Sequence, residues 1–362
     1  MVYLLLICKM LFFIGMGGLA SFSAITLLST NNQNYKISFI YALGIGPALA
    51  SLLLYYLLLL LPGYTSPTYL AIIFLIYTTL IVINPKSINV FVKTFSSILK
   101  SGSLVFKLNT GVKNYFFNTN NIFIGILFIV FAVGVKNILL TQMPGHDVLE
   151  YMVQGEYLFE DKAIEYVPHR YYPTTGFYYV GLHGWSFPLQ VTLEKMVDNI
   201  TFFGFDLYFK SLTLWYGVLL LTIVYTLSKK YMDVLYALSI ISILCLAKGY
   251  LTSIIFFHID SYRMFFFCLS FLFTLQQINK PNFKSLPVLA FVAGTSGFSH
   301  SLGVIIAIIL GAGLLLYIPK NWRYKIKYLL TYTFLVLLFG GIHYVIDVFY
   351  GTGWIFKEID FY

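Results

Sequence analysis

Asp147 and Glu150 are two carboxylates, three positions apart, that could take part in chemistry. They follow the turn Pro144-Gly145 and begin a stretch of helical periodicity that continues to about Glu160. An acidic pair with this spacing at a helix start is typical of a capping box, where carboxylates accept hydrogen bonds from free backbone N–H groups. A capping carboxylate can still face a ligand. The pattern therefore leaves capping and chemistry open as equal alternatives.

A second group of chemically capable residues lies further along the chain. It contains Lys248, the pair His258-x-Asp260, and Arg263. A histidine with carboxylates can hold a hard or borderline divalent cation, so His258 and Asp260 are candidate metal ligands. The same residues could instead form a hydrogen-bonded cluster with Arg263.

Between these groups, a segment rich in aromatic residues adds a cation, an imidazole and an indole. Arg170 follows His169 and precedes two tyrosines, and its planar guanidinium suits bidentate contact with phosphate. An ion pair with one of the many acids of this segment is the alternative, which we favour slightly. Trp185 could stack on a sugar, although anchoring at lipid headgroups is the commoner role of such a residue.

These residues belong to a chain whose composition is that of an integral membrane protein. Of 362 residues, 59% are hydrophobic and 10% are charged, whereas soluble domains carry about 25% charged residues. Apolar runs of about 20 residues match the thickness of a bilayer's hydrocarbon core. The net charge of +9 does not indicate nucleic-acid binding, because no basic patch interleaved with aromatic residues stands out on a soluble module.

The apolar runs predict an all-α bundle of about ten transmembrane helices. We expect the first to be a retained helix, not a signal peptide, because its one charge, Lys9, lies inside the run. The predicted helices cover residues 2–28, 37–61, 68–84, 122–141, 207–228, 231–248, 262–278, 286–299, 301–318 and 327–346.

The charges in the connecting loops predict which side faces the cytoplasm. Ten alternating spans place fourteen lysines and arginines on one side together with a single acid, Asp233. By the positive-inside rule this side is cytoplasmic. The other thirteen acids and all six histidines then lie on the opposite side. The candidate site is therefore predicted on the non-cytoplasmic face of an inner or plasma membrane.

The loops divide the chain into three predicted parts. Residues 1–84 form an N-terminal three-helix segment, 85–121 a cytoplasmic linker, and 122–362 a larger transmembrane module. The linker repeats lysine every seven residues among apolar residues, which favours a basic amphipathic helix at a lipid surface. The module carries the long outer loop 142–206, whose aromatic content favours short helices at the membrane interface.

This layout resembles the GT-C glycosyltransferases, particularly the branch of protein O-mannosyltransferases and aminoarabinose transferases. The resemblance lies in Gly145-His146-Asp147-Val148-Leu149-Glu150-Tyr151 after a span, and in Phe257-His258-Ile259-Asp260-Ser261 in a later outer loop. It covers about residues 120–350.

The resemblance implies a polyprenyl-phosphate-linked sugar donor and a glycan, lipid or protein acceptor. It implies that Asp147, or less readily Glu150, acts as general base or orients the acceptor. His258 and Asp260 would assist or bind a divalent metal. The cations expected at the lipid phosphate are Arg170, Lys248 and Arg263.

The chain differs from that family in having about three spans before the motif-bearing one and fewer spans after it. A partner subunit or a truncated product would explain this difference. A lipid or polysaccharide transporter or flippase is the main alternative, although transporters usually carry ionisable residues near the membrane midplane. A second alternative is an O-antigen polymerase or ligase, in which Arg170 and His169 would matter most. A third is a structural subunit of an envelope complex.

Overall fold

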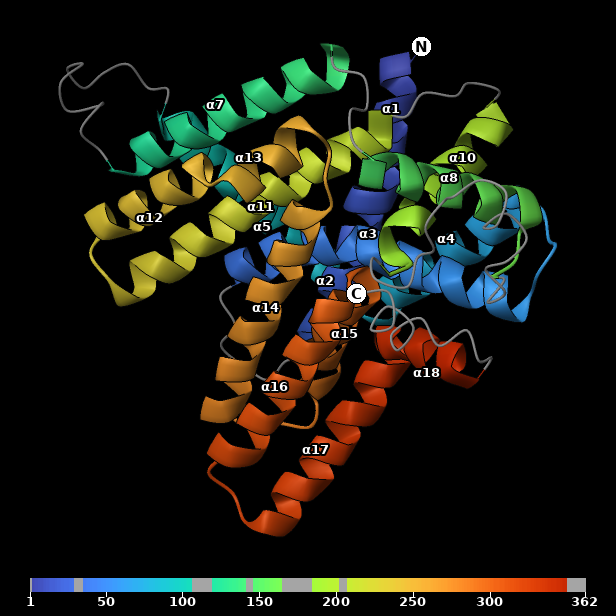
Figure 1. Ribbon diagram of the computed structural model, residues 1–362. Coiled ribbons are helices and arrows are strands. Elements are labelled where there is room, and N and C mark those ends of the chain that lie inside the picture. Colours follow the sequence, from blue (N-terminus) through green and yellow to red (C-terminus); the bar gives the residue numbers. More distant parts are fainter. Residues whose placement is uncertain are drawn as a thin grey trace.

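The computed structural model describes residues 2–28, 35–105, 119–140, 146–164, 184–201 and 207–349. Within these ranges the regular structure is helical and contains no strand (Figure 1). The expected all-α architecture is confirmed for this part of the chain.

Six helical segments among the described residues are long and apolar enough to cross a membrane. Each coincides with a predicted span. They are Tyr3–Leu28 in α1 (Val2–Met10), η1 (Leu11–Met16) and α2 (Gly17–Leu28); Ser38–Leu60 in α3 (Tyr35–Leu60); α4 (Ser66–Ile83); Asn121–Leu140 in α7 (Thr119–Leu140); Leu207–Lys229 in α11 (Leu207–Tyr231); and Trp322–Ile346 in α17 (Trp322–Val336), η2 (Leu337–Gly341) and α18 (Ile342–Phe349).

The expectation of ten spans is not confirmed. Helices α12 (Val234–Leu246) and α13 (Lys248–Ile255) qualify only as a pair, bent by 60°. Helices α15 (Leu286–Ser299) and α16 (Ser301–Tyr317) have 14 and 17 residues. At about 1.5 Å per residue they are shorter than the roughly 30 Å hydrocarbon core. The 20-residue α14 (Asp260–Asn279) carries polar residues at both ends, so it too lies outside the qualifying set.

Small residues allow the N-terminal helices to pack closely, as is usual between helices in a membrane. A Cβ atom added at Gly46 of α3 would lie 2.5 Å from the backbone nitrogen of Gly18 in α2. The backbones of α2 and α3 therefore touch, and any larger residue would force them apart.

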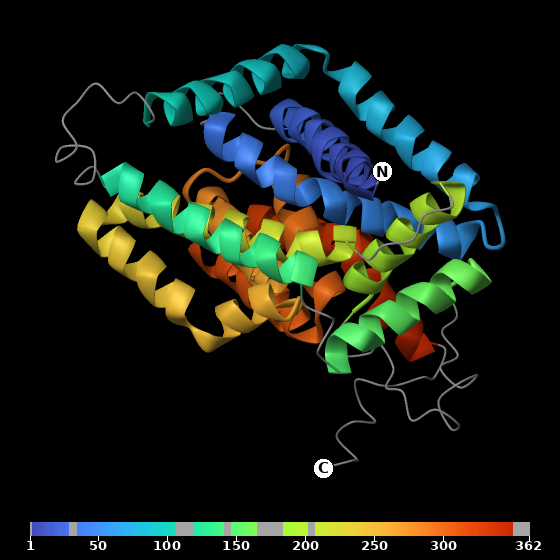
Figure 2. The same cartoon turned by 90° about the horizontal axis from the view of Figure 1, so that it is seen from above.

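Helix α5 (Lys86–Val105) is the predicted basic amphipathic helix, and it lies across α2 and α3 at the edge of the molecule (Figure 2). Phe91 packs against Phe22 and Phe39, while Lys86 and Lys93 are exposed. The amphipathic character is confirmed, and the cytoplasmic location remains a prediction.

Two contacts join turns that the charge pattern places on the same side of the membrane. At one end, Phe283 packs against Tyr324, so the lysine-bearing turns α14–α15 and α16–α17 meet. At the other end, the Gly63 N–H donates to the Lys162 carbonyl at 2.9 Å, which joins the α3–α4 turn to the long loop. We call these the lysine-rich end and the acidic end. In Figure 1 the α11–α12 and α16–α17 turns lie to the left and bottom, and α8 and α10 to the right.

The long loop contains two short helices, α8 (His146–Asp161) and α10 (Ser186–Thr201), packed against each other. The Thr192 hydroxyl donates to the Gly155 carbonyl at 3.0 Å, and a Cβ atom at Gly155 would lie 2.5 Å from that of Val191. The predicted short helices are therefore present, but α10 is mostly buried in the bundle and does not lie on its surface.

Candidate functional site

Three of the predicted site residues meet at the acidic end, where α13 turns into α14. The Nδ1 atom of His258 lies 3.1 Å from Oδ2 of Asp260. Arg263 donates from Nη2 to the other carboxylate oxygen, Oδ1. All three side chains are about one fifth exposed, so a ligand can reach them. We call His258, Asp260 and Arg263 the His258 cluster.

A strained turn holds this cluster in place. Phe257 has a φ of +58° and is buried, which is an unusual conformation for a large side chain. The Ser253 hydroxyl donates to the His258 carbonyl at 2.6 Å and accepts from the Ser261 N–H at 2.7 Å. Backbone strain of this kind persists only when the surroundings fix it, and it is concentrated at functional sites.

Electrostatics keeps Asp260 ionised. Burial by itself raises the pKa of the Asp260 carboxyl, but the hydrogen bond from His258 and the positive charge of Arg263 outweigh that effect. The charges of His258 and His300 act in the same direction, and the net pKa lies below its ordinary value. The cluster therefore presents one carboxylate among several cationic or imidazole groups.

The long loop reaches this cluster through the first turn of α10. The hydroxyls of Ser186 and Tyr262 are hydrogen-bonded, and Tyr262 is two residues from Asp260. Gly184 has a φ of +70°, and a Cβ atom there would lie 2.2 Å from the Phe298 carbonyl oxygen. The long loop thus meets the start of α14 at residues 184–186, next to the α15–α16 junction that carries His300.

The remaining predicted site residues are placed less directly. Asp147 and Glu150 lie in the first turn of α8, and their side chains are outside the described residues, as are His169 and Arg170 altogether. Trp185 is buried, with 6% exposure, just before α10.

Lys248 lies apart from the His258 cluster. It is exposed at the bend between α12 and α13. The eight residues of α13 separate it from the cluster, a helix length of roughly 12 Å.

The metal hypothesis gains no support from this geometry. Among the described residues, no group of three or more His, Cys, Asp or Glu side chains could hold a metal ion. Both oxygens of Asp260 already face side-chain partners, Arg263 and His258. The described arrangement fits the alternative of a hydrogen-bonded cluster, and metal binding remains a prediction.

Sequence reasoning missed a line of buried polar residues on α10. Ser186, Gln190, Glu194 and Asp198 recur every four residues, which places them on one helical face, and all four are buried. Gln190 donates to the Pro47 carbonyl and to the Ser51 hydroxyl of α3. This face of α10 therefore packs against the N-terminal helices through polar contacts.

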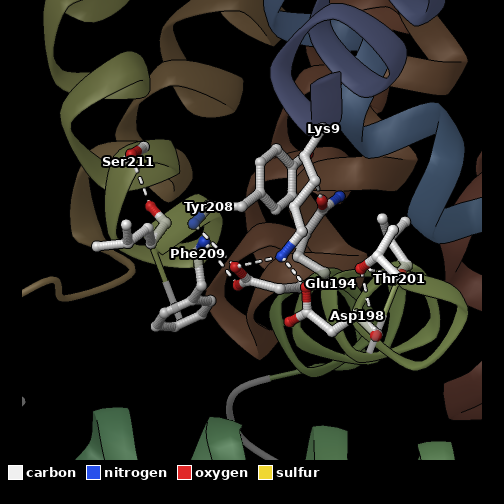
Figure 3. A network of polar contacts seen from close by, with 10 residues as sticks. Lys9, Glu194, Asp198, Thr201, Tyr208, Phe209 and Ser211 are labelled. Carbon is white, nitrogen blue, oxygen red and sulfur yellow. Dashed lines mark hydrogen bonds and ion pairs between the residues drawn. The ribbon is translucent and has the colours of Figure 1, made fainter. Parts of the chain in front are cut away.

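Glu194 and Asp198 share one cation from the far end of the sequence. The ammonium of Lys9 lies 3.1 Å from Oε1 of Glu194 and 2.5 Å from Oδ1 of Asp198 (Figure 3). The signal for this ion triad was Lys9 itself, a charge inside an apolar run. Such a charge costs about 2.5–3.5 kcal/mol on insertion scales and usually has a partner.

An apolar groove of about 720 Å³ lies between α15, α16, α17 and α18. Its lining is dominated by small or aliphatic residues, among them Gly297, Ala307, Gly311, Ala312 and Leu329. Ile308 also lines it and is 66% exposed, so the groove opens at the surface of the bundle. Gly297 precedes His300 by three residues, roughly one helical turn of about 5 Å.

Comparisons of the chain with protein-family models, with curated proteins and with solved structures found no match.

Proposed function

We propose that this protein is a membrane glycosyltransferase of GT-C-like architecture. It would move a sugar from a polyprenyl-phosphate-linked donor to an acceptor on the non-cytoplasmic face of the inner or plasma membrane. In this proposal α12, α14, α15 and α16 also cross the membrane and complete a bundle of about ten spans. The observation that carries the proposal is the partly exposed His258 cluster at the acidic end, near the upper end of an apolar groove.

The groove and the cluster match the two parts of such a donor. Apolar walls suit an isoprenoid chain, and Arg263 with the neighbouring imidazoles of His258 and His300 suits its phosphate. Because the groove ends about one turn below His300, a lipid lying in it would bring its phosphate toward the cluster. The phosphate would then sit at the acidic end, and the chain would remain among apolar side chains.

The chemistry of transfer assigns separate roles to the residues. An acceptor hydroxyl attacks the anomeric carbon, the bond from that carbon to the phosphate oxygen breaks, and the polyprenyl phosphate leaves with the bonding electrons. Asp147, in the first turn of α8, takes the hydroxyl proton as general base. Arg263 and His258 stabilise the negative charge of the departing phosphate, and Asp260 positions both.

The direct test uses purified protein in nanodiscs with a panel of polyprenyl-phosphate-linked hexoses and pentoses. A membrane extract supplies the acceptor. Release of free polyprenyl phosphate is measured, so the acceptor need not be identified in advance. Asp147→Asn should reduce release by a factor of about 10²–10⁴ without lowering the folded amount. Glu160→Gln, an exposed acid at the far end of α8, is the matched control. Full activity of Asp147→Asn would remove Asp147 from the site.

The groove can be tested separately. Ala312 lines it and is exposed, so Ala312→Phe should obstruct the groove while leaving the buried core intact. We expect KM for the lipid donor to rise by about tenfold, as for the loss of about 1.4 kcal/mol of binding. Ile309→Phe, on an exposed position of the same helix outside the groove lining, should leave KM unchanged. Equal KM values for both variants would exclude the groove as the lipid site.

The orientation is tested by labelling. A cysteine placed at Tyr178, in a variant whose three native cysteines are replaced, should react with an impermeant maleimide on intact cells. Labelling only after permeabilisation would place the long loop in the cytoplasm and contradict the proposed active face.

A transporter is the second candidate, and two observations favour it. The only lysine of the first span is paired with two buried carboxylates, and buried ionisable residues often mark a transport path. Helices α12 and α13 form a bent pair, which resembles the discontinuous helices of transporters. Flux of a lipid-linked sugar across proteoliposomes without release of polyprenyl phosphate would favour this candidate over the transferase.

A further inference from the structure

The ion triad of Lys9, Glu194 and Asp198 is fully enclosed. The exposed fractions of these three residues are 3%, 1% and 6%. Lys9 comes from α1, and the two carboxylates come from successive turns of α10, 185 and 189 positions later in the chain. Figure 3 shows the ammonium lying between the two carboxylates.

The ammonium of Lys9 is shared by two buried carboxylates, Glu194 and Asp198. Glu194 also accepts hydrogen bonds from the backbone N–H groups of Tyr208 and Phe209, both at 2.9 Å. These groups belong to the first turn of α11, where the helix dipole is positive. Burial still dominates and raises the pKa of Glu194 to about 7, although Lys9 and the two backbone donors act to lower it.

The charged and titratable groups around Glu194 come from a small number of elements. Lys9 of α1 and Asp198 of α10 are the charged neighbours, and Tyr208 of α11 is the neighbouring phenol. Where α3 packs on α10 it presents neutral groups, the Pro47 carbonyl and the Ser51 hydroxyl.

Two further elements contribute to this environment. Tyr77 of α4 interacts electrostatically with Tyr208. From α8, Glu156 pairs with Lys195, which is partly exposed and lies on another face of α10. The pKa of about 7 places the charge change of Glu194 near neutral pH.

The triad is mechanically connected to the His258 cluster. The same helix that carries Glu194 begins at Ser186, whose hydroxyl bonds to Tyr262 of α14. Between them, Gln190 of α10 accepts from the Tyr208 hydroxyl at 3.2 Å. A shift of α10 relative to α1 and α11 would therefore change the hydrogen bond from Ser186 to Tyr262, which is two residues from Asp260.

We propose that the Lys9–Glu194–Asp198 triad is a proton-sensitive latch, in which a proton bound at Glu194 tightens the docking of α10 and so positions its first turn at the His258 cluster. Lys9 and Glu194 are positioning residues in this scheme. The proposal rests on the proposed function only where transfer activity is the readout, because the latch itself is a property of the fold.

The direction of the pH effect follows from the environment of Glu194. An exposed glutamate in the undocked state binds a proton less tightly than the buried one in the docked state. The docked state is therefore favoured as pH falls from above 7 toward 6, and that advantage is lost as pH rises through about 7. At high pH Glu194 is ionised in a buried site, which costs desolvation free energy.

The first experiment measures thermal unfolding of the full chain in neutral-lipid nanodiscs at pH 6, 7 and 8.5. The wild type should have a higher Tm at pH 6 than at pH 8.5. Glu194→Gln, which keeps the shape and an acceptor oxygen, should flatten this dependence and raise Tm at pH 8.5. Glu156→Gln removes a carboxylate from a partly exposed pair between α8 and α10 and should keep the wild-type dependence.

The opposite result would overturn the latch. If Glu194→Gln retains the wild-type slope, the proton is bound elsewhere. If it lowers Tm equally at all three values, Glu194 is a plain structural ion-pair partner.

A second measurement asks whether α10 is the element that responds. Hydrogen exchange, corrected for the intrinsic pH dependence, should show stronger protection of residues 186–201 at pH 6 than at pH 8.5 in the wild type and no such difference in Glu194→Gln. A pH effect spread evenly over α10 and α17 would contradict a local latch.

Activity provides the arm that depends on the proposed function. If transfer is found, the alkaline decline of the wild-type rate should shift upward in pH in Glu194→Gln. A flat Tm profile of that variant without any transfer would leave the latch standing and remove the transferase. Transfer together with an unchanged Tm slope would support the transferase and exclude the latch.

Discussion

Two groups of ionisable residues in this protein both combine carboxylates with cationic side chains, but the pKa of a carboxyl group is raised in one and lowered in the other. In the ion triad, two carboxylates share one ammonium and are enclosed, and burial raises the pKa of Glu194 to about 7. In the His258 cluster, one carboxylate lies between an imidazole and a guanidinium, and the pKa of Asp260 falls below its ordinary value. Burial dominates at Glu194, whereas His258 and Arg263 outweigh the partial burial of Asp260.

The comparison separates a structural use of charge from a chemical one. Buried ion pairs gain little net stability over apolar contacts, but removing one partner is costly because the other charge is left buried. A partly exposed cluster tolerates such a loss, since water replaces the missing partner. The triad should therefore control folding and its pH dependence, and the His258 cluster should control activity.

The largest effect is expected from removing the cation of the triad. Lys9→Met leaves Glu194 and Asp198 buried without their shared ammonium and should cost about 3–5 kcal/mol of stability. Fluorescence-detected size-exclusion chromatography after heating would show the loss. Lys136→Met, an exposed lysine in another span, should behave as the wild type. A stable Lys9→Met variant would mean that the triad does not hold α10.

A smaller effect on folding, with a large effect on activity, is expected in the other region. Arg263→Gln should reduce transfer by about 10²–10³, as for loss of one group that stabilises developing charge. The stability cost should stay near or below about 1 kcal/mol because the pair is partly exposed. Arg323→Gln at the lysine-rich end is the control. Loss of stability without loss of activity would reverse the roles of the two regions.

The two regions should also respond to different ranges of pH. Because the pKa of Asp260 is lowered, its ionised form adds stability that is present at neutral pH and lost as pH falls below the ordinary value. Asp260→Asn should therefore keep the wild-type Tm dependence between pH 6 and 8.5 and blunt only the loss below about pH 4. A flattened pH dependence of Tm near neutrality in this variant would mean that the cluster, and not the triad, causes that dependence.

The smallest effect is expected from chelation. Because both oxygens of Asp260 face side chains, EDTA should leave transfer within about twofold of the untreated rate. Elemental analysis of the purified protein provides an independent check. Loss of activity that a divalent cation restores would instead support the metal site predicted at His258 and Asp260.

Much of the architecture could be predicted from the sequence because membrane burial imposes a simple rule on each segment. Runs of about 20 apolar residues predicted the six qualifying helices, and the lysine spacing predicted α5. The shorter apolar runs were not confirmed as spans, since hydropathy alone does not reveal the 60° bend between α12 and α13 or the length of α15.

The candidate site was only partly accessible to the same reasoning. The sequence by itself determined that His258, Asp260 and Arg263 are close together, because Asp260 and Arg263 are three positions apart at a helix start and His258 is two residues before Asp260. Only the tertiary structure decided that α10 is buried and that its Glu194 meets Lys9, 185 residues earlier. A hydropathy pattern describes each segment against lipid or water, whereas an ion pair between distant segments depends on how the helices pack.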